Sequence, residues 1–201
     1  MIRIIGKVPP KVTIACSGGI DSMVFAHFLL QGKREIELAY FNHDTKHGQD
    51  AEQFVEDFAL ENNMPLHIGR VKGTKGKRSV EEFWRDERYA FFDTLNSDYI
   101  ITCHHLDDCV ETWIMSSLHG TGKIIPFRRS LNIYRPFLMT EKRSIKRYAA
   151  KHKISWIEDP SNSGTHYMRN YVRKHIVPHA LKVNPGLRKV LRKKMLELYV
   201  K

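Results

Sequence analysis

Residues 11–31 read KVTIACSGGIDSMVFAHFLLQ and set the start of the fold. The first part is a short apolar run typical of a buried strand, and the last part carries apolar residues at helical spacing. SGG at residues 17–19 lies between them, with Asp21 and Ser22 directly behind. Two adjacent glycines at a strand-to-helix turn let the backbone approach a ligand and aim N–H groups at it, beside the positive end of the helix. The stretch predicts a pyrophosphate cradle, and a plain Gly-Gly turn is the alternative.

The same alternation continues along the first half of the chain. We expect three more strands and three more helices, the strands at 36–42, 66–71 and 98–103 and the helices at 49–63, 80–95 and 106–118. Strands that alternate with helices form parallel βαβ units, so the expected fold class is α/β, a doubly wound, mainly parallel sheet flanked by helices. Ligands bind such sheets at the carboxyl ends of the strands, where the strand order reverses.

The pattern changes after Gly120. Residues 125–138 are typical of irregular structure with a short strand pair, and residues 155–170 of an ordered polar loop. We expect basic helices over three segments, at 140–152, 170–178 and 184–201. The last of these has Asn184 as a predicted N-cap and Pro185 in the first helical position.

Charge divides the chain into unequal halves. Residues 1–100 hold 13 Lys and Arg against 15 Asp and Glu, whereas residues 101–201 hold 20 against 7. A basic half of this kind predicts a polyanion partner, and the alternative is a basic surface that only meets solvent. We therefore predict two parts, a catalytic α/β domain at 1–138 and a basic helical C-terminal segment at 139–201.

Composition argues against two classes of protein. No stretch approaches the roughly 20 apolar residues that a membrane span needs, and the first ten residues are too soon interrupted by charge and proline to form a secretory signal. The three cysteines, Cys16, Cys103 and Cys109, show no CxxC spacing. They indicate a reducing cytoplasm and argue against a structural zinc or an iron–sulfur cluster held by this chain alone.

A second unusual stretch, HHLDDCVET at residues 104–112, follows the strand predicted at 98–103. Asp108 and Glu111 are three apart, so on a helix they share a face and could hold one cation, a primary ammonium or Mg²⁺, between them. The alternative is a pair of first-turn carboxylates that complement the helix dipole. For the adjacent histidines, separate hydrogen-bonding roles are favoured over a shared metal.

Both stretches resemble motifs of known enzymes. SGGIDS resembles the pyrophosphate-binding loop of the N-type ATP pyrophosphatases, the PP-loop superfamily, and HHLDDCVET resembles the corresponding motif of the tRNA(Ile)-lysidine synthetase family. Further pieces match that family in the same order: Arg85, Arg88-Tyr89, Gly120-Thr121-Gly122, Arg135-Pro136, Trp156-Ile157-Glu158-Asp159 with Ser161-Asn162, Arg169-Asn170 and Val177-Pro178. The resemblance implies an adenine nucleotide alpha hydrolase-like fold. Members of that family commonly continue into further domains that grip the tRNA, so the resemblance also implies a short form that ends after the N-terminal catalytic domain. The basic half could then hold the tRNA through phosphate contacts alone, and the alternative is a minimal form or one that acts on a smaller RNA.

The resemblance further implies a two-step reaction with ATP and Mg²⁺ as cofactors. ATP adenylates the C2 carbonyl oxygen of the wobble cytidine, C34, in the isoleucine tRNA with a CAU anticodon. The ε-amine of free L-lysine then displaces AMP and gives lysidine. The implied partners are therefore this tRNA and lysine, with no membrane and no DNA.

Roles for particular residues follow from the same resemblance. ATP would be bound by Ser17, Gly18, Gly19, Ile20, Asp21, Ser22, His104 and His105. Asp21 would also hold Mg²⁺. The substrate would be bound by Asp108, Glu111, Arg88 and Tyr89, the two carboxylates holding the lysine ammonium.

Two arginines complete the expected catalytic set of Asp21, Asp108, Glu111, Arg85 and Arg169. Arg85 and Arg169 would clamp phosphate or stabilise the flipped-out base, with planar donors that lysine cannot mimic.

One departure and two alternatives remain open. Asp44-Thr45 stands where the family usually has glycine and an apolar residue, so a wall of the adenosine or lysine site could differ. A related PP-loop enzyme that thiolates a tRNA base is a second hypothesis, because Cys103 and Cys109 lie near the expected crevice. A catalytically inactive RNA-binding relative is the third.

Overall fold

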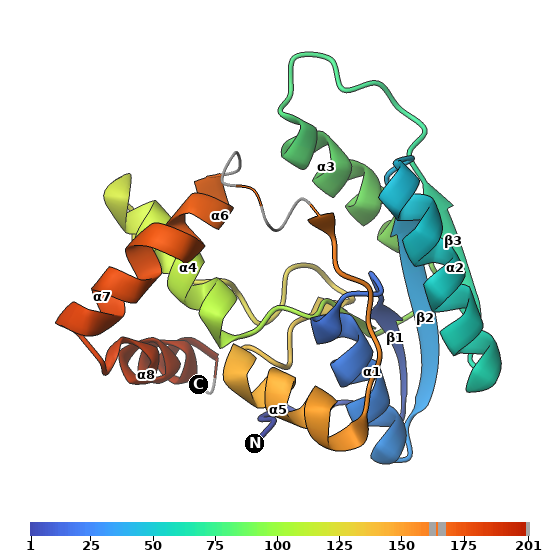
Figure 1. The fold of residues 1–201 in the computed structure, drawn as a ribbon, viewed down its shortest axis with the longest axis horizontal. Coiled ribbons are helices and arrows are strands. Elements are labelled where there is room, and N and C mark those ends of the chain that lie inside the picture. Colours follow the sequence, from blue (N-terminus) through green and yellow to red (C-terminus); the bar gives the residue numbers. More distant parts are fainter. Residues whose placement is uncertain (161–163, 165–167, 200–201) are drawn as a thin grey trace.

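A computed structural model describes residues 1–160, 164 and 168–199 of the chain. Its centre is a five-stranded sheet in the order β3-β2-β1-β4-β5, in which every pair of neighbouring strands is parallel (Figure 1). The strands are β1 (Lys11–Ala15), β2 (Glu35–Asn42), β3 (Leu66–Arg70), β4 (Ile100–Ile101) and β5 (Ile133–Tyr134). The strand order reverses between β1 and β4, so the α/β, doubly wound, parallel fold class is confirmed.

Helices cover both faces of the sheet. They are α1 (Ile20–Gln31), α2 (Lys46–Glu61), α3 (Val80–Asp93), α4 (Leu106–Leu118), α5 (Lys142–His152), α6 (Met168–Tyr171), the π-helix η2 (Val172–Ile176), α7 (Val177–Val183) and α8 (Leu187–Tyr199). Side chains alternate along the strands, so Leu38 of β2 packs with α1, α2 and α5, whereas its neighbour Ala39 packs with α3 on the other face. A third core joins α4, α7 and α8 beside the sheet (Figure 1).

Several predicted boundaries differ from the structure, most by one to three residues. Helix α2 begins at Lys46 rather than at residue 49, because the Thr45 side chain caps it by accepting from the Gly48 N–H at 3.0 Å. The helix expected at 170–178 starts at Met168 and continues through a π-turn to Val183.

Asn184 does not cap α8, which begins at Leu187. Its side-chain oxygen accepts from the Gly186 N–H at 2.9 Å and closes a tight turn, so Pro185 lies in that turn and not in the helix. The short strand pair expected at 125–138 is reduced to β5, which joins the main sheet, and one antiparallel bridge between Arg128 and Tyr134.

The division of the chain at residue 138 stays a prediction. Helix α5 packs its buried Ile145 and Ala149 into the same core as α1, as Figure 1 shows by their side-by-side placement. In the described part of the chain, none of the helices combines the length and apolar character that crossing a membrane requires.

Candidate active site

The turn between β1 and α1 holds the predicted cradle. Ser22, which is buried, donates from Oγ to the Gly19 carbonyl oxygen at 2.9 Å and accepts from the Ser17 N–H at 3.2 Å. Gly18 has φ +75°, and a Cβ on it would lie 3.0 Å from Cγ2 of Ile157. Glycine is therefore required at this position both by the left-handed backbone and by the close approach of the loop before residue 160.

Helix α1 opens directly from this turn. Gly19 is its N-cap residue, and no side chain in the described part of the chain caps the helix. The N–H groups of the first turn, which includes Ile20 and Asp21, are therefore left for another acceptor. Together with the helix dipole they suit an anion at this position.

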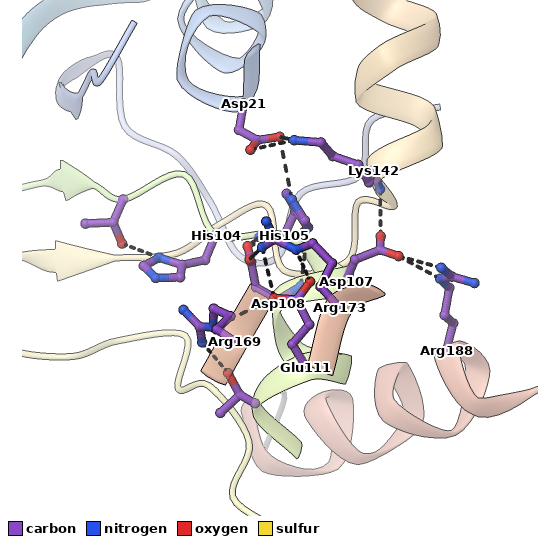
Figure 2. Close-up of polar contacts among 12 residues, drawn as sticks. Asp21, His104, His105, Asp107, Asp108, Glu111, Lys142, Arg169, Arg173 and Arg188 are labelled. Carbon is purple, nitrogen blue, oxygen red and sulfur yellow. Dashed lines mark hydrogen bonds and ion pairs between the residues drawn. The ribbon is translucent and has the colours of Figure 1, made fainter. Parts of the chain in front are cut away.

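Asp21 lies at one edge of the network of polar contacts shown in Figure 2. Its two carboxylate oxygens accept from Nζ of Lys142 at 2.6 and 2.7 Å, and Oδ1 lies 3.6 Å from Nε2 of His105. Magnesium in phosphate-transfer sites is commonly bound by one or two carboxylates together with substrate phosphates. The partly exposed Asp21 carboxylate beside the cradle fits that donor set, and the described residues contain no cluster of three or more metal-ligating side chains.

The two histidines lie at the start of α4 and have separate roles. His105 caps the helix reciprocally with Asp108: its N–H donates to Oδ2 at 2.8 Å, and its Nδ1 accepts from the Asp108 N–H at 3.4 Å. His104 lies with Nδ1 3.1 Å from Oγ1 of Thr102. Burial, assisted by the charge of Arg135, lowers the pKa of His104 to about 3, so its imidazole is neutral near pH 7.

Asp108 and Glu111 share one face of α4, but a cation of the chain already lies against them. Nε and Nη2 of Arg173 donate to the two Glu111 oxygens at 2.6 and 3.0 Å, and Nη2 lies 3.7 Å from Oδ1 of Asp108 (Figure 2). Hydrogen bonding to Glu111 raises the pKa of the Arg173 guanidinium. Burial would raise the pKa of Asp108, but its contacts with His105 and the charge of Arg169 lower it. Arg173 and Asp108 are therefore charged near pH 7, whereas burial raises the pKa of Glu111 against the opposing hydrogen bonds from Arg173.

Arg173 was missed by the sequence analysis, whereas Arg169 was not. Arg169 donates from Nη2 to Oγ1 of Thr112 at 2.7 Å, and its Nε lies 3.7 Å from Glu111. The two arginines are four apart on the helical segment 168–183, so they lie on the same side of it. That spacing was the available signal for Arg173.

The remaining predicted residues form a separate group on α3. The guanidinium carbons of Arg85 and Arg88 lie 6.0 and 5.8 Å from the ring centroid of Tyr89. No contact within residues 1–160, 164 and 168–199 joins this group to Asp108 or Glu111. The substrate-binding role expected of Asp108, Glu111, Arg88 and Tyr89 stays a prediction. Ser161 and Asn162, part of the family motif, lie outside the described residues.

Comparison with known proteins agrees with the fold and the cradle. The sequence model described as the PP-loop domain matches residues 3–180. The chain belongs to the PP-loop family. It is similar to the tRNA(Ile)-lysidine synthase of Persephonella marina, at 35% identity over 88% of the chain and 43% of the relative. It is also similar to that of Nitrosomonas europaea, at 30% over 90% of the chain and 43% of the relative.

The chain therefore spans less than half the length of these curated relatives. A solved structure with the same fold is the U34-tRNA thiolase NcsA from Methanococcus maripaludis, with a TM-score of 0.73 and 17% identity over 96% of this chain and 72% of that chain. The suspected resemblance to the lysidine synthetase family is confirmed by the curated relatives.

The backbone at Asp44, where the family pattern usually has glycine, is in a left-handed conformation. Asp44 has φ +57°, a left-handed conformation that glycine adopts easily and that aspartate tolerates better than most residues. Its N–H donates to the side-chain oxygen of Asn42 at 2.8 Å, which supports the turn. In this PP-loop protein Asp44 thus adopts a backbone conformation that usually favours glycine.

The cysteines of this PP-loop protein are not poised as nucleophiles. Burial raises the pKa of Cys16, Cys103 and Cys109, so all three thiols are protonated near pH 7. Cys103 points its sulfur toward the carbonyl oxygen of Ala15, at 3.7 Å. These environments weigh against the hypothesis of a base thiolase that works through its own thiolates.

We expect the free energy of unfolding to fall as the pH drops from about 6.5 toward 3. His104 binds a proton near its ordinary pKa of 6.5 in the unfolded chain but only at about 3 in the folded one. The unfolded state therefore holds more protons in that window, and one such histidine contributes a slope of up to about 1.4 kcal/mol per pH unit.

Urea unfolding at pH 7, 6 and 5 measures this slope. His104→Gln should flatten it by about one proton, whereas the exposed His119→Gln should leave it unchanged. Equal slopes in the His104 variant and the wild type would contradict the assignment. Burial also lowers the pKa of His43, to about 4, so His43 adds to the same fall in the free energy of unfolding. It does so equally in the wild type and in the His104 variant.

Proposed function

We propose that this PP-loop protein ligates L-lysine to C2 of the wobble cytidine, C34, of tRNA(Ile) with a CAU anticodon. The reaction passes through an adenylated tRNA and releases AMP and pyrophosphate. The observation that carries the proposal is one continuous set of contacts from the glycine cradle to the acidic pair. It runs from Asp21 through His105 and Asp108 to Arg173 and Glu111. The names of the curated relatives support it.

Adenylation takes place at the cradle. The C2 oxygen of cytosine attacks the α-phosphorus of ATP, and the bond to the pyrophosphate group breaks. The N–H groups at the start of α1 and the hydroxyls of Ser17 and Ser22 bind that leaving group. Mg²⁺ held by Asp21 would neutralise the charge that develops on it. Lys142, within 2.6 Å of Asp21, supplies a further positive charge at the same place.

Lysine attack takes place at the acidic pair. The lone pair of the ε-amine bonds to C2, the bond from C2 to the AMP oxygen breaks with its electron pair leaving on AMP, and the proton released from the nitrogen passes to solvent water. An amine held as an ammonium has no free lone pair, so Asp108 and Glu111 bind the α-ammonium and leave the ε-amine to react. Arg173 then turns from Glu111 to the lysine carboxylate, which keeps every charge paired.

The arginines act on the RNA side of the site. Arg169 lies within reach of Glu111 and Thr112 and so stands between the lysine and the base. Arg85, with Arg88 and Tyr89 on α3, approaches phosphate or the flipped-out base. Two histidines line the ATP site between the glycine cradle and the arginines of α3. They are His105, which lies beside Asp21, and His104, which burial keeps neutral.

The protein acts in the cytoplasm. The basic segment 139–201 forms its RNA-facing part, beside the domain at 1–138. The net positive charge of this segment makes RNA binding depend strongly on salt. Of the alternatives, the base thiolase is disfavoured by the buried, protonated thiols. The inactive RNA-binding relative is disfavoured by the intact cradle and acidic pair.

The test is an incubation with tRNA(Ile) bearing the CAU anticodon, Mg-ATP and labelled lysine. We expect label to become fixed in the tRNA with the wild type and not with Asp108→Ala. Because Asp108 also caps α4, pyrophosphate release by the variant serves as the check that it folds.

Other outcomes separate the hypotheses. Pyrophosphate release that depends on RNA, without label in the tRNA, would mean that the activation chemistry is right and the nucleophile is wrong. RNA binding with neither signal would favour the inactive relative and overturn the proposed function.

A further inference from the structure

Four arginine side chains surround one tyrosine on the face of the sheet that α3 covers. The guanidinium carbon of Arg129 lies 3.7 Å from the ring centroid of Tyr89, with Arg88 and Arg85 farther out. Nη2 of Arg135 donates to the Tyr89 hydroxyl at 3.3 Å. We call these five residues the tyrosine–arginine cluster.

The cluster contains no carboxylate. Within the described ranges, none of its four arginines forms an ion pair with an acidic side chain. The nearest acids on α3 have other partners: Asp86 pairs with Arg78 at 3.0 Å, and Glu87 accepts from backbone N–H groups of the preceding loop. The cluster is therefore a concentration of positive charge without internal compensation.

Burial makes this arrangement costly for Arg135 and the half-buried Arg88, whereas Arg85 and Arg129 are exposed. Arg135 is only 3% exposed, one of its donors reaches the Pro126 carbonyl oxygen at 2.8 Å, and its Nε is buried without a partner. Burial and the charges of Arg85 and Arg129 lower the pKa of Arg88. Buried cations of this kind are normally paired, since leaving them alone costs several kcal/mol. An anion from outside the chain would supply the missing partner.

We propose that the tyrosine–arginine cluster binds a phosphate group of the RNA substrate, next to the nucleotide that reacts. Planar guanidinium groups around a common centre match phosphate oxygens, which accept two parallel hydrogen bonds from one arginine. The charges of Arg88 and Arg135 reach the His104 ring, so the cluster adjoins the candidate active site. This inference rests on the proposed function and adds Arg129 and Arg135 to it.

ATP is the other source of phosphate, and the position of the cluster favours RNA. Tyr89 packs with Ala39, Ile100 and Ile133 on one face of the sheet, whereas α1 and Lys142 of α5 belong to the opposite side. The triphosphate has its own donors at the cradle on that side. A phosphate of the RNA backbone can instead reach the α3 side while its base enters the crevice.

Arg129→Ala tests the proposal, and the neighbouring Arg128→Ala is its matched control. Both changes remove one positive charge from the same loop. The Arg128 guanidinium, however, donates to the carbonyl oxygens of Ser130 and Leu131 at 2.9 and 2.6 Å and lies over Tyr134. Affinity for the tRNA and for Mg-ATP is measured separately, the tRNA at several salt concentrations.

We expect Arg129→Ala to lower tRNA affinity about tenfold near 0.1 M salt and to reduce the slope of log affinity against log salt by about 0.7. ATP affinity should not change, and Arg128→Ala should have a much smaller effect on tRNA. The melting temperature of Arg129→Ala should change little, because relief of the repulsion between Arg129 and Arg88 offsets loss of the contact with the Tyr89 ring. A structural role for the side chain would lower it.

Three results would overturn the assignment. A loss of ATP affinity with unchanged tRNA binding would make the cluster part of the nucleotide site. Equal losses of tRNA affinity in Arg129→Ala and Arg128→Ala would indicate an effect of general surface charge. Unchanged affinity of Arg129→Ala for both tRNA and ATP would show that the cluster binds neither. Lysine incorporation is scored in a separate assay. If the wild type incorporates no lysine but its tRNA binding is still weakened by Arg129→Ala, the proposed function would be contradicted and the phosphate site would stand.

Discussion

Asp21→Asn is expected to slow the RNA-dependent release of pyrophosphate about a thousandfold while leaving tRNA affinity unchanged. The change removes one negative charge at the start of α1 and keeps the shape of the side chain. Positive charge at the leaving pyrophosphate is worth several kcal/mol in such reactions, and the Asp21 carboxylate is the acidic group at the cradle that would hold Mg²⁺ there. Pyrophosphate release measured as a function of Mg²⁺ concentration checks the prediction.

Lys142→Met is the matched control for this variant. In the structure Asp21 and Lys142 are each other's ion-pair partners, so a purely structural pair would give the same loss from either change. We expect Lys142→Met to lower the rate without raising the Mg²⁺ concentration needed for half-maximal activity, because Mg²⁺ no longer has to displace Lys142 from Asp21. A similar Mg²⁺ dependence in Asp21→Asn and the wild type would show that Asp21 does not hold the metal.

The parts of the fold that could be predicted from sequence depend on local patterns. The strand-to-helix turn at Ser17–Ser22 follows from adjacent glycines at the end of an apolar run, and the shared face of Asp108 and Glu111 follows from helical spacing. Parallel strand order then follows from the alternation of strands and helices. Errors occurred where a side chain had two possible local partners. Asn184 closes a turn onto Gly186 when it could equally have capped a helix.

The site contacts that sequence could not supply join distant parts of the chain. Asp21 meets Lys142 at the start of α5, and Glu111 meets Arg173 in the π-helix. Such pairs depend on how α5 and the segment 168–183 pack against α1 and α4, and local periodicity carries no information about that packing. The contact of Arg129 with Tyr89 could not be predicted from sequence for the same reason: the two residues lie on different elements.

The two cation sites expected from sequence share one property in the structure. Each acidic group, Asp21 and the pair of Asp108 with Glu111, is held by a basic side chain from beyond residue 138. Mutual pairing limits the cost of burying these carboxylates when no substrate is bound. Substrate cations must therefore exchange with Lys142 and Arg173, and binding is expected to depend on salt at both places.

Glu111→Gln is expected to raise the KM for lysine about a hundredfold while RNA-dependent pyrophosphate release continues. The substitution keeps the size of a side chain that is only 3% exposed but removes the charge that would bind the α-ammonium. A hydrogen bond to a charged group contributes about 1.5–3 kcal/mol, which corresponds to a change of roughly ten- to a hundredfold. Lysine titrations of label incorporation, run beside pyrophosphate release on the same preparations, measure the two effects separately.

Asp107→Asn is the matched control for the acidic pair. Asp107 precedes Asp108 in the same helical turn, but its oxygens accept from the Lys142 N–H at 2.7 Å and from Arg188 Nε at 3.0 Å, so it joins α4 to α5 and α8. Loss of its charge should lower the melting temperature and leave the KM for lysine near the wild-type value. If Asp107→Asn raised the KM for lysine as much as Glu111→Gln, general loss of negative charge at the start of α4 would explain both results. The acidic pair would then not be the lysine site.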